Sequence, residues 1–461
     1  MPTVNRERLL RDLRELRQFG ASETHPLGVV RPSFSDDDLA SRRWLLAKFE
    51  EAGLVPAFDG VGNAFGRSPN SGPALLVGSH SDTQPRGGWL DGAMGVIYGL
   101  ECARALAEDP ATAHLAVDVC AWTDEESSFL GMVGSKSFVG LLPDGAVETA
   151  RSIGVLDESG GVKIEAGEPL LDALARNGLA DAPRLEMEDD RYLGFFEAHI
   201  EQGPWLEARH KQIGVVTSCV GIDGVVVSFV GAQNHAGTTP MALRADAGLA
   251  AIRLASRIDA AFESIKTEDS VWNIGKLTIS PGAASIVSGE ATLTLQFRDP
   301  SNDQQARFRA TAVALIEEAK AEQEQGRQAI QSEGLVKPVV KISSEWRAAL
   351  PAAAMAEGLM CHVQSAAEHL APGRWQRMPS GAGHDAQTFA RVMPAAMLFV
   401  PSINGLSHVF DENTCDDDLV LGCEVYTEAA VRMLQCPEMQ SLVGQWRRGQ
   451  EIDGVATVAK L

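Results

Sequence analysis

Two hydrophobic periods alternate along this chain, and their alternation predicts an α/β fold. Leucines recur at helical spacing over 9–16, and a second helix is predicted from a Ser-Asp start to a glycine over 35–53. Short apolar runs then alternate with a helical pattern, which gives strands at 63–68, 74–80 and 115–126 and a helix at 94–109. Because strands buried on both faces read as continuous apolar runs, this order predicts a sheet covered by helices.

The pattern changes near residue 214, which predicts a second domain. Residues 213–232 read as strand, turn and strand, and a helical period follows over 245–265. Two more alternating segments and a long helix complete the series, at 271–282, 290–300 and 303–325. Strand–helix–strand–strand–helix order is typical of a small α+β sandwich.

The α/β pattern then returns, with an apolar run over 395–402 and a last helix over 419–434. The first domain is therefore expected to be split by the second. We predict a catalytic domain made of 1–213 and 346–461, with an inserted domain over 214–345.

Composition narrows the class of protein. A net charge of -22 argues against nucleic acid and anionic membrane as partners, and 45% hydrophobic residues supply a large core. The chain offers no run of 18 apolar residues and no signal-peptide core near its start. Its seven cysteines form no C-x-x-C pair, which favours free thiols. These features predict a cytoplasmic protein.

Four segments place histidines and carboxylates at or just after predicted strand ends. They contain His80, Asp82 and Asp91; Asp124, Glu125 and Glu126; Glu197, His199 and Glu201; and His408 and Glu412. Imidazole with carboxylate is the ligand set of zinc or a similar divalent ion. Each segment alone also fits a capped strand end or a solvated acidic face. Together they offer too many ligands for one ion with an open position, and suit two ions that share a carboxylate.

These residues carry a family resemblance over about 5–435. The motifs GSHSDT, DGAMGV, EESSF, HIEQGPWLE, NHAGTTPMALRADA, SGAGHDA and PSINGLSH occur in order. The chain thereby resembles the zinc-dependent amidases of the hydantoinase/carbamoylase family, which includes N-carbamoyl-L-amino acid hydrolases, β-ureidopropionases and allantoate amidohydrolases. The family lies within the aminoacylase/carboxypeptidase metallohydrolase superfamily. The resemblance implies a mixed-sheet catalytic domain with an inserted ferredoxin-like lid and dimerisation domain, and hence a homodimer.

The resemblance also implies two divalent ions in each subunit, with zinc expected and manganese, cobalt or nickel as alternatives. It assigns one ion to His80, Asp91 and His199, and the other to Asp91, Glu126 and His408. Glu125 is then the general base for a metal-activated water. Asp82 is expected to fix the tautomer of His80, and Glu412 to support His408.

Further residues are expected to contact the substrate. His235 is a candidate oxyanion donor that the family sends into the partner subunit's site, although it could simply shape a glycine-rich turn. Arg298 suits a substrate carboxylate, the alternative being an ion pair with Asp299 or another neighbour. His384 is expected to line the pocket, unless it is a loop histidine bonded to backbone. Gln202 is a further candidate for substrate binding.

The sequence departs from the family at positions near the substrate. Ser127 and Ser128 replace the usual Gly and Arg, Ile222 replaces a Gln, and Ser285 replaces an Asn. That Gln and Asn normally help to grip the carboxylate end. We therefore expect an altered pocket that is more apolar near Ile222.

The function expected is hydrolysis of a linear C–N bond in an N-carbamoyl-amino acid or related ureido or acyl-amide. An N-acyl amino acid or dipeptide hydrolase of the same superfamily is the alternative with the same site. A non-catalytic ligand-binding protein on this fold is the alternative of another class.

Overall fold

The computed structural model describes residues 1–331, 338–347 and 349–451, with side chains up to 325 in the first of these ranges. Two compact units emerge, Met1–Cys219 with Ala353–Leu461, and Val220–Ala352. The inserted unit thus starts and ends a few residues later than the expected 214–345. The start lies later because the strand Ile213–Cys219 pairs within the sheet of the larger unit. The end lies later because the chain is still bonded to the smaller unit beyond residue 345, where Arg347 N donates to Gly224 O.

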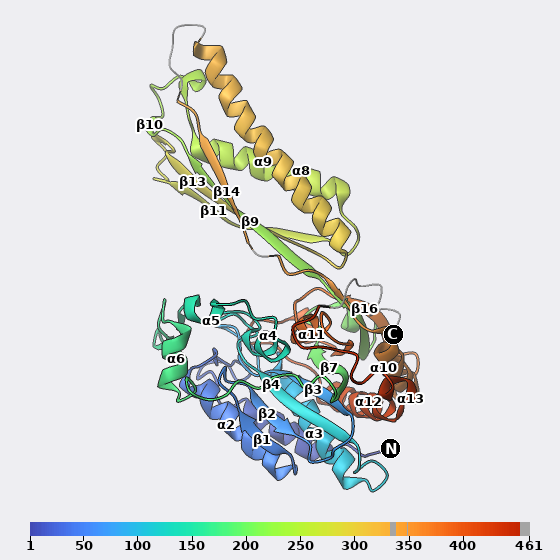
Figure 1. Ribbon diagram of the computed structural model, residues 1–461. Helices are drawn as coiled ribbons and strands as arrows, with labels where there is room; N and C mark the ends of the chain where they lie inside the picture. The colour runs from blue at the N-terminus through green and yellow to red at the C-terminus, as the bar shows by residue number, and fades with distance from the viewer. Residues whose placement is uncertain (332–337, 348, 452–461) are drawn as a thin grey trace. The chain divides into compact units, whose positions relative to one another are not determined.

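The larger unit is built around a mixed sheet with helices packed on it (Figure 1). Its strands are β1 (Val55–Phe58), β2 (Ala64–Arg67), β3 (Ala74–His80), β4 (Ala116–Trp122), β5 (Val155–Leu156), β6 (Val162–Ile164), β7 (Tyr192–Ile200), β8 (Ile213–Cys219), β15 (Ala353–Ala354), β16 (Trp375–Ser380) and β17 (Ala395–Val400). Its helices are α1 (Arg6–Leu16), α2 (Asp36–Glu51), α3 (Ala93–Glu108), α4 (Val133–Val139), α5 (Ala146–Thr149), α6 (Leu170–Arg176), α7 (Trp205–Ala208), η2 (Ile403–Gly405), α10 (Glu357–Leu370), α11 (Asp385–Phe389), α12 (Asp416–Gln435) and α13 (Pro437–Gln440).

In the described part of the chain, the strands of this sheet lie in the order β1-β2-β4-β3-β7-β17-β8-β15, and β16 also pairs with β8. The central pairs β4–β3, β3–β7 and β7–β17 are parallel, and every residue of these four strands is buried. Burial on both faces explains their continuous apolar sequences. Because parallel strands end at one edge, β3, β4, β7 and β17 all deliver their following residues to the same edge of the sheet.

Local capping accounts for the helices that frame this sheet. The Asn5 side chain accepts a hydrogen bond from Arg8 N at the start of α1, and Ser35 does the same for Asp38 N at the start of α2. Helix α3 begins immediately after Asp91 and Gly92, and packs against β3 and β4. The start of α3 therefore lies directly beside the candidate metal ligand Asp91.

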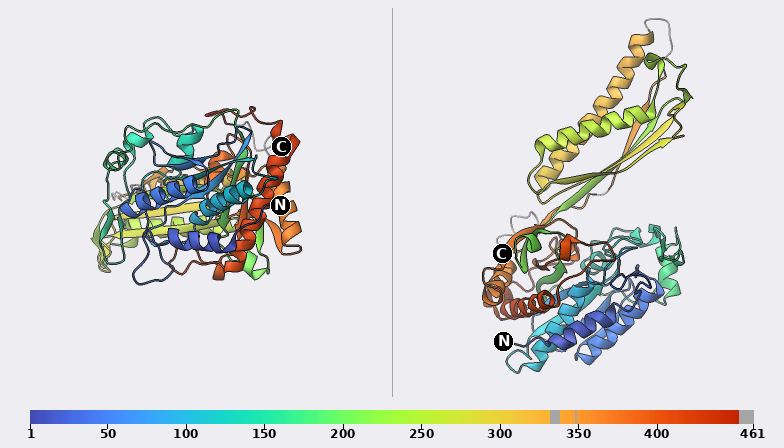
Figure 2. Two further views of the ribbon diagram at one scale, coloured as in Figure 1. Left: turned by 90° about the horizontal axis from the view of Figure 1, so that it is seen from below. Right: turned by 180° about the vertical axis from the view of Figure 1, so that it is seen from behind.

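The smaller unit has the strand and helix order β9-α8-β11-β13-α9-β14. Its elements are β9 (Gly221–Val230), β10 (Asn234–His235), η1 (Met241–Leu243), α8 (Ala247–Ile265), β11 (Val271–Ser280), β12 (Ile286–Val287), β13 (Glu290–Asp299), α9 (Asn302–Gln331) and β14 (Lys341–Trp346). The antiparallel sheet runs β11-β13-β9-β14, with α8 and α9 together on one face (Figure 2). This is the ferredoxin-like arrangement, so the predicted fold class is confirmed.

Two further observations concern the whole described chain. Among the described residues, none of the helices combines the length and the apolar character that crossing a bilayer requires. All seven cysteines fall in the described part of the chain and are free thiols.

Candidate metal centre

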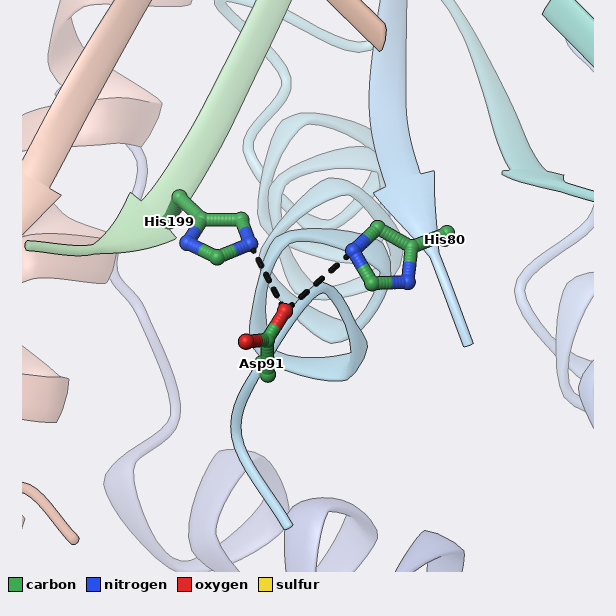
Figure 3. Close-up of side chains that lie close together, drawn as sticks. All are labelled: His80, Asp91 and His199. Atoms are coloured by element: carbon green, nitrogen blue, oxygen red, sulfur yellow. Dashed lines mark ion pairs between the residues drawn. The ribbon is translucent and has the colours of Figure 1, made fainter. Parts of the chain in front are cut away.

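Asp91 lies at the centre of the candidate site, between three histidines. Its Oδ1 is 3.3 Å from His80 Nε2 and 3.2 Å from His199 Nε2 (Figure 3). Its Oδ2 is 3.2 Å from His408 Nε2, and Glu126 Oε1 is 3.6 Å from the same nitrogen. The structure therefore brings all five expected ligands together, in two groups that share Asp91: His80, Asp91 and His199, and Asp91, Glu126 and His408.

The first group is held by the ends of two buried strands and the start of a helix. His80 ends β3 and His199 lies near the end of β7, while Asp91 precedes α3. All three residues are buried. Gly92 has a φ of +63°, and an ideal Cβ there would lie 2.4 Å from His80 Nε2. Glycine is therefore required at this position to leave room for the imidazole.

Backbone carbonyls set the tautomers of these two histidines. His80 Nδ1 is 3.0 Å from Asp82 O, and His199 Nδ1 is 2.9 Å from Ile200 O. A ring nitrogen beside a carbonyl oxygen carries the proton, so the Nε2 lone pairs face Asp91. Gly92 N also donates to His199 Nε2 at 3.1 Å, which agrees with a lone pair on that nitrogen.

Asp82 contacts His80 mainly through its main chain. The group that contacts His80 Nδ1 most closely is the Asp82 carbonyl, since its carboxylate Oδ1 is 3.7 Å away. The carboxylate Oδ2 instead accepts a hydrogen bond from Glu126 N, and Arg42 lies 3.7 Å from Oδ1. Asp82 therefore connects the ends of β3 and β4, which carry ligands of different groups.

The second group is more exposed and rests on loops. The His408 side chain is 47% exposed, and its backbone has a φ of 57°. Glu412 supports this group through the backbone, because Oε1 accepts from Asp91 N at 3.0 Å and Oε2 from His408 N at 3.3 Å. Gln84 Nε2 donates to Glu126 Oε2 at 2.6 Å. Gln84 was not predicted from the sequence, because no spacing rule distinguishes it from its polar neighbours.

The electrostatics of the site favour positive charge among the carboxylates. Burial raises the pKa of Asp91, but His199, His408 and His80 outweigh it and hold that pKa well below its usual range. A hydrogen bond to Asp91 raises the pKa of His408 to about 9. Burial and the charge of Asp91 raise the pKa of Glu126 to about 7.

The donor set fits divalent cations. Glu126 Oε1 is buried and accepts no hydrogen bond from any described residue, although it lies near His408. In the first group, Asp91 Oδ1 faces two imidazole lone pairs, which repel it unless a cation or proton lies between them. Nitrogen and oxygen ligands of this kind suit first-row divalent ions.

Glu125 lies beside the first group without belonging to it. Its Oε2 is 3.8 Å from His80 Nε2, and its side chain is 11% exposed. Burial raises the pKa of Glu125 well above its usual value, and the charge of Glu126 adds to that rise. A carboxylate with a raised pKa is suited to taking up a proton near neutral pH.

His384 is buried and lies against the first group. Its Nε2 is 2.8 Å from Ser380 Oγ, and the centres of its ring and the His199 ring are 4.6 Å apart. The hydrogen bond goes to a side chain, which differs from the backbone-bonded alternative. Burial and the charge of His199 keep the pKa of His384 well below its usual value.

Three further candidate substrate residues, Ile222, Ser285 and Arg298, lie in the smaller unit, whereas Gln202 lies in the larger one. Ile222 and Arg298 are direct partners across β9 and β13. Arg298 Nε donates to Gln296 Oε1 at 3.1 Å, whereas the Asp299 carboxylate accepts hydrogen bonds from Thr267, Ser270 and Ser301. Ser285 is exposed, and its carbonyl accepts a hydrogen bond from Ala236 N.

His235 is exposed on β10, and the turn after it fixes its tautomer. Gly237 N and Thr238 N both donate to His235 Nδ1, at 3.0 and 3.2 Å. A nitrogen that accepts hydrogen bonds has no proton, so Nε2 of the neutral ring carries it. The histidine thus shapes the turn, as the alternative stated, and still presents an N–H donor to solvent.

Comparison with known proteins places the chain in a family. Residues 76–432 match the model of Peptidase family M20/M25/M40. An N-carbamoyl-L-amino-acid amidohydrolase of Paenarthrobacter aurescens is 32% identical over 91% of this chain and 96% of its own. A ureidoglycolate hydrolase of Oryza sativa subsp. japonica is 30% identical over 93% of this chain and 85% of its own.

Comparison with solved structures also indicates this family. A crystal structure of an amidase of the hydantoinase/carbamoylase family from Burkholderia phymatum is 45% identical, covers 94% of this chain and 98% of its own, and has a TM-score of 0.79. The chain belongs to the M20/M25/M40 peptidase family. Relatives over nearly the whole chain are named as amidohydrolases and hydrolases, and the chain is accordingly a hydrolase, which favours the enzyme prediction over a non-catalytic binding protein.

Proposed function

We propose that this chain hydrolyses the linear C–N bond of an N-carbamoyl-amino acid or a closely related ureido acid, using two divalent cations in each subunit. The observation that carries the proposal is the division of Asp91 between two ligand groups, with Glu125 alongside the first. The names of the relatives support the substrate class, because they include N-carbamoyl-L-amino-acid and ureidoglycolate hydrolases. Zinc is the expected ion, and manganese, cobalt and nickel are alternatives.

The residues that would hold the ions are His80, Asp91 and His199 for one, and Asp91, Glu126 and His408 for the other. Bound there, the ions lower the pKa of water and polarise the scissile carbonyl. Glu125 takes the proton of the attacking water and delivers it to the leaving nitrogen, for which its raised pKa is suited. Burial of this carboxylate excludes competing water from it.

Arg298 is proposed to bind the substrate carboxylate. Gln296 Oε1 accepts a hydrogen bond from Nε and so orients the guanidinium, a group whose planar fork suits a bidentate contact with a carboxylate. The partner of Arg298 across the sheet is Ile222, so the neighbouring surface is apolar. A substrate with a carboxylate next to an apolar side chain matches this pair. His384, Gln202 and Ser285 remain proposed substrate contacts.

The substrate class is tested with a panel of N-carbamoyl, N-acetyl and dipeptide forms of one amino acid. We expect ammonia release from the N-carbamoyl compound at a kcat/KM at least about 100-fold above the other two. Preferential release of amino acid from the N-acetyl compound or dipeptide, without ammonia, would show that the alternative substrate class is correct.

A homodimer formed through the inserted unit is proposed as the working assembly. β11 is an edge strand of its sheet and exposes Val271, Leu277 and Ile279, and α8 exposes Ile252. Exposed apolar side chains at an open strand edge favour pairing with a second copy.

The register of the same sheet supports the dimer. Arg298 pairs with Ile222 at one end of β9, whereas β10, which carries His235, follows the opposite end at Val230. Eight residues of strand separate Ile222 from Val230, which at roughly 3.3 Å each is about 26 Å. One copy of the inserted unit therefore cannot bring His235 and Arg298 to one small substrate, whereas two copies can supply one residue each.

The dimer is tested by sedimentation of Leu277→Asp, with Lys276→Asp on the same strand as a control. We expect a dimer in the wild type and the control, and a monomer with lost activity in Leu277→Asp. A wild-type chain that is monomeric and fully active would overturn the proposal.

We also propose a cytoplasmic location, supported by the seven free thiols and tested by cell fractionation.

A further inference from the structure

Gln202 places its side-chain amide on the second ligand group. Gln202 follows β7, and Nε2 donates to Asp91 Oδ2 at 2.8 Å. The same nitrogen is 3.2 Å from His408 Nε2. These two atoms belong to the group completed by Glu126. The amide therefore contacts two of the atoms that a second cation would use.

The other atom of this amide has no hydrogen bond. Gln202 Oε1 is buried and has no hydrogen-bond partner among the described residues. The oxygen and nitrogen of a carboxamide have nearly the same size and exchange places when the group turns by half a revolution. A turned amide would direct the unpaired oxygen at Asp91 and His408. That arrangement sets the amide oxygen against the Asp91 carboxylate oxygen, and a cation between the two oxygens would make it favourable.

We propose that Gln202 is a ligand of the second cation through Oε1. This inference rests on the proposed two-cation site and adds a fourth protein ligand to Asp91, Glu126 and His408. The second position then has three oxygens and one nitrogen, against two nitrogens and one oxygen in the first. Oxygen ligands favour harder ions such as Mn²⁺.

The backbone supports this assignment. Gln202 and His408 both have left-handed backbone, with φ of 58° and 57°. This conformation is unfavourable for residues other than glycine and persists where the surroundings fix it. Gln202 N donates to Ser402 Oγ at 3.0 Å, and His408 N donates to Glu412 Oε2. Both main chains are thus anchored, while the amide at the end of the Gln202 side chain can still turn.

The test measures binding of Mn²⁺ alone to the full-length, chelator-treated protein, with the free ion counted by electron paramagnetic resonance. The variants are Gln202→Leu, which removes the amide, and Gln202→Glu, which keeps an oxygen ligand. Gln18→Leu, at an exposed residue just after α1, is the matched control. We expect two ions in the wild type and control, and a second dissociation constant raised at least 10-fold in Gln202→Leu. The first constant should change less than threefold, and Gln202→Glu should bind the second ion at least as tightly as the wild type.

Each outcome decides the assignment. An unchanged or tighter second ion in Gln202→Leu would mean that the amide only competes with the cation, and would overturn the inference. If Gln202→Leu does not fold, as judged by circular dichroism, Gln202→Glu decides alone, because a weaker second ion there also contradicts a ligand role. A wild-type protein that binds a single ion would instead contradict the two-cation site of the proposed function.

Discussion

Asp91 Oδ2 lies 3.2 Å from His408 Nε2, which joins the loop before α3 to the loop after β17. The other oxygen of the same carboxylate faces two buried histidines. One side chain therefore couples a buried ligand group to an exposed one. Most of the expected behaviour of the site follows from this coupling.

Replacing Asp91 by Asn should disturb both ion positions at once. The amide keeps the shape of the side chain but loses the charge that all three histidines face. We expect elemental analysis of purified Asp91→Asn to find less than one ion per subunit, and activity to fall at least about 1,000-fold. Asp411→Asn, in the exposed loop beyond His408, is the control and should retain both ions. Two tightly held ions in Asp91→Asn would contradict the bridging role.

Replacing Glu125 by Gln should remove catalysis while leaving the ions in place. Glu125 contacts His80 only at 3.8 Å, so its loss removes a base and no ligand. We expect kcat to fall by about 1,000-fold or more with an unchanged metal content. The measurement is steady-state kinetics alongside elemental analysis. Activity within tenfold of the wild type would mean that another group accepts the proton.

The two ions should leave in a fixed order on chelation. The first group is fully buried, whereas the second depends on the half-exposed His408. Timed treatment with EDTA should give a long-lived species with one ion per subunit, followed by loss of the other. Activity should disappear with the first ion to leave and return on addition of Zn²⁺, Mn²⁺, Co²⁺ or Ni²⁺. Simultaneous loss of both ions, or activity in a verified metal-free sample, would be the contrary result.

Replacing Arg298 by Lys should weaken binding of the substrate more than it slows the reaction. Lysine keeps the charge but loses the bidentate fork and the hydrogen bond to Gln296. We expect KM to rise about 10-fold or more with kcat changed less than threefold. Arg309→Lys is the matched control, because that arginine contacts Asp223 and Trp346 on the same unit. Equal effects in both variants would indicate general damage to the unit.

Asp385 should make the metal-free protein less stable as pH rises. Burial, together with the charge of Glu197, raises the pKa of Asp385 to about 8, against about 3.9 in an unfolded chain. Between these values the folded state holds a proton that the unfolded state has released, so stability falls from about pH 4 to pH 8. We expect Asp385→Asn to gain on the order of 1–3 kcal/mol relative to the wild type between pH 5 and pH 8. Urea unfolding of chelator-treated samples measures this difference, and an equal pH dependence in both proteins would refute it.

The histidines of the first group lie at or near strand ends, as the sequence pattern predicted. An apolar run that stops at His80, and another that stops before Asp124, mark the edge to which parallel strands deliver their next residues. The boundary at residue 214 was less well predicted. β8 and β9 are both apolar and adjacent, and only their partners show that β8 belongs to the larger sheet.

The supporting contacts could not be predicted from spacing. Gln84 and Gln202 reach the carboxylates of Glu126 and Asp91 through side-chain torsions, which leave no period in the sequence. The same is true of Asp82, whose carbonyl rather than its carboxylate orients His80. Such contacts depend on loop conformation, which the hydrophobic pattern does not encode.

Gly92 limits how this enzyme can be altered. A methyl group at that position would occupy the space of the His80 imidazole, which we propose as a ligand of the first ion. Libraries that randomise the loop from Gln84 to Trp89 to alter selectivity should therefore keep residue 92 constant. A variant with a substitution at Gly92 would have its first metal position blocked. Such a variant would therefore be inactive in a screen, even if its other substitutions were beneficial.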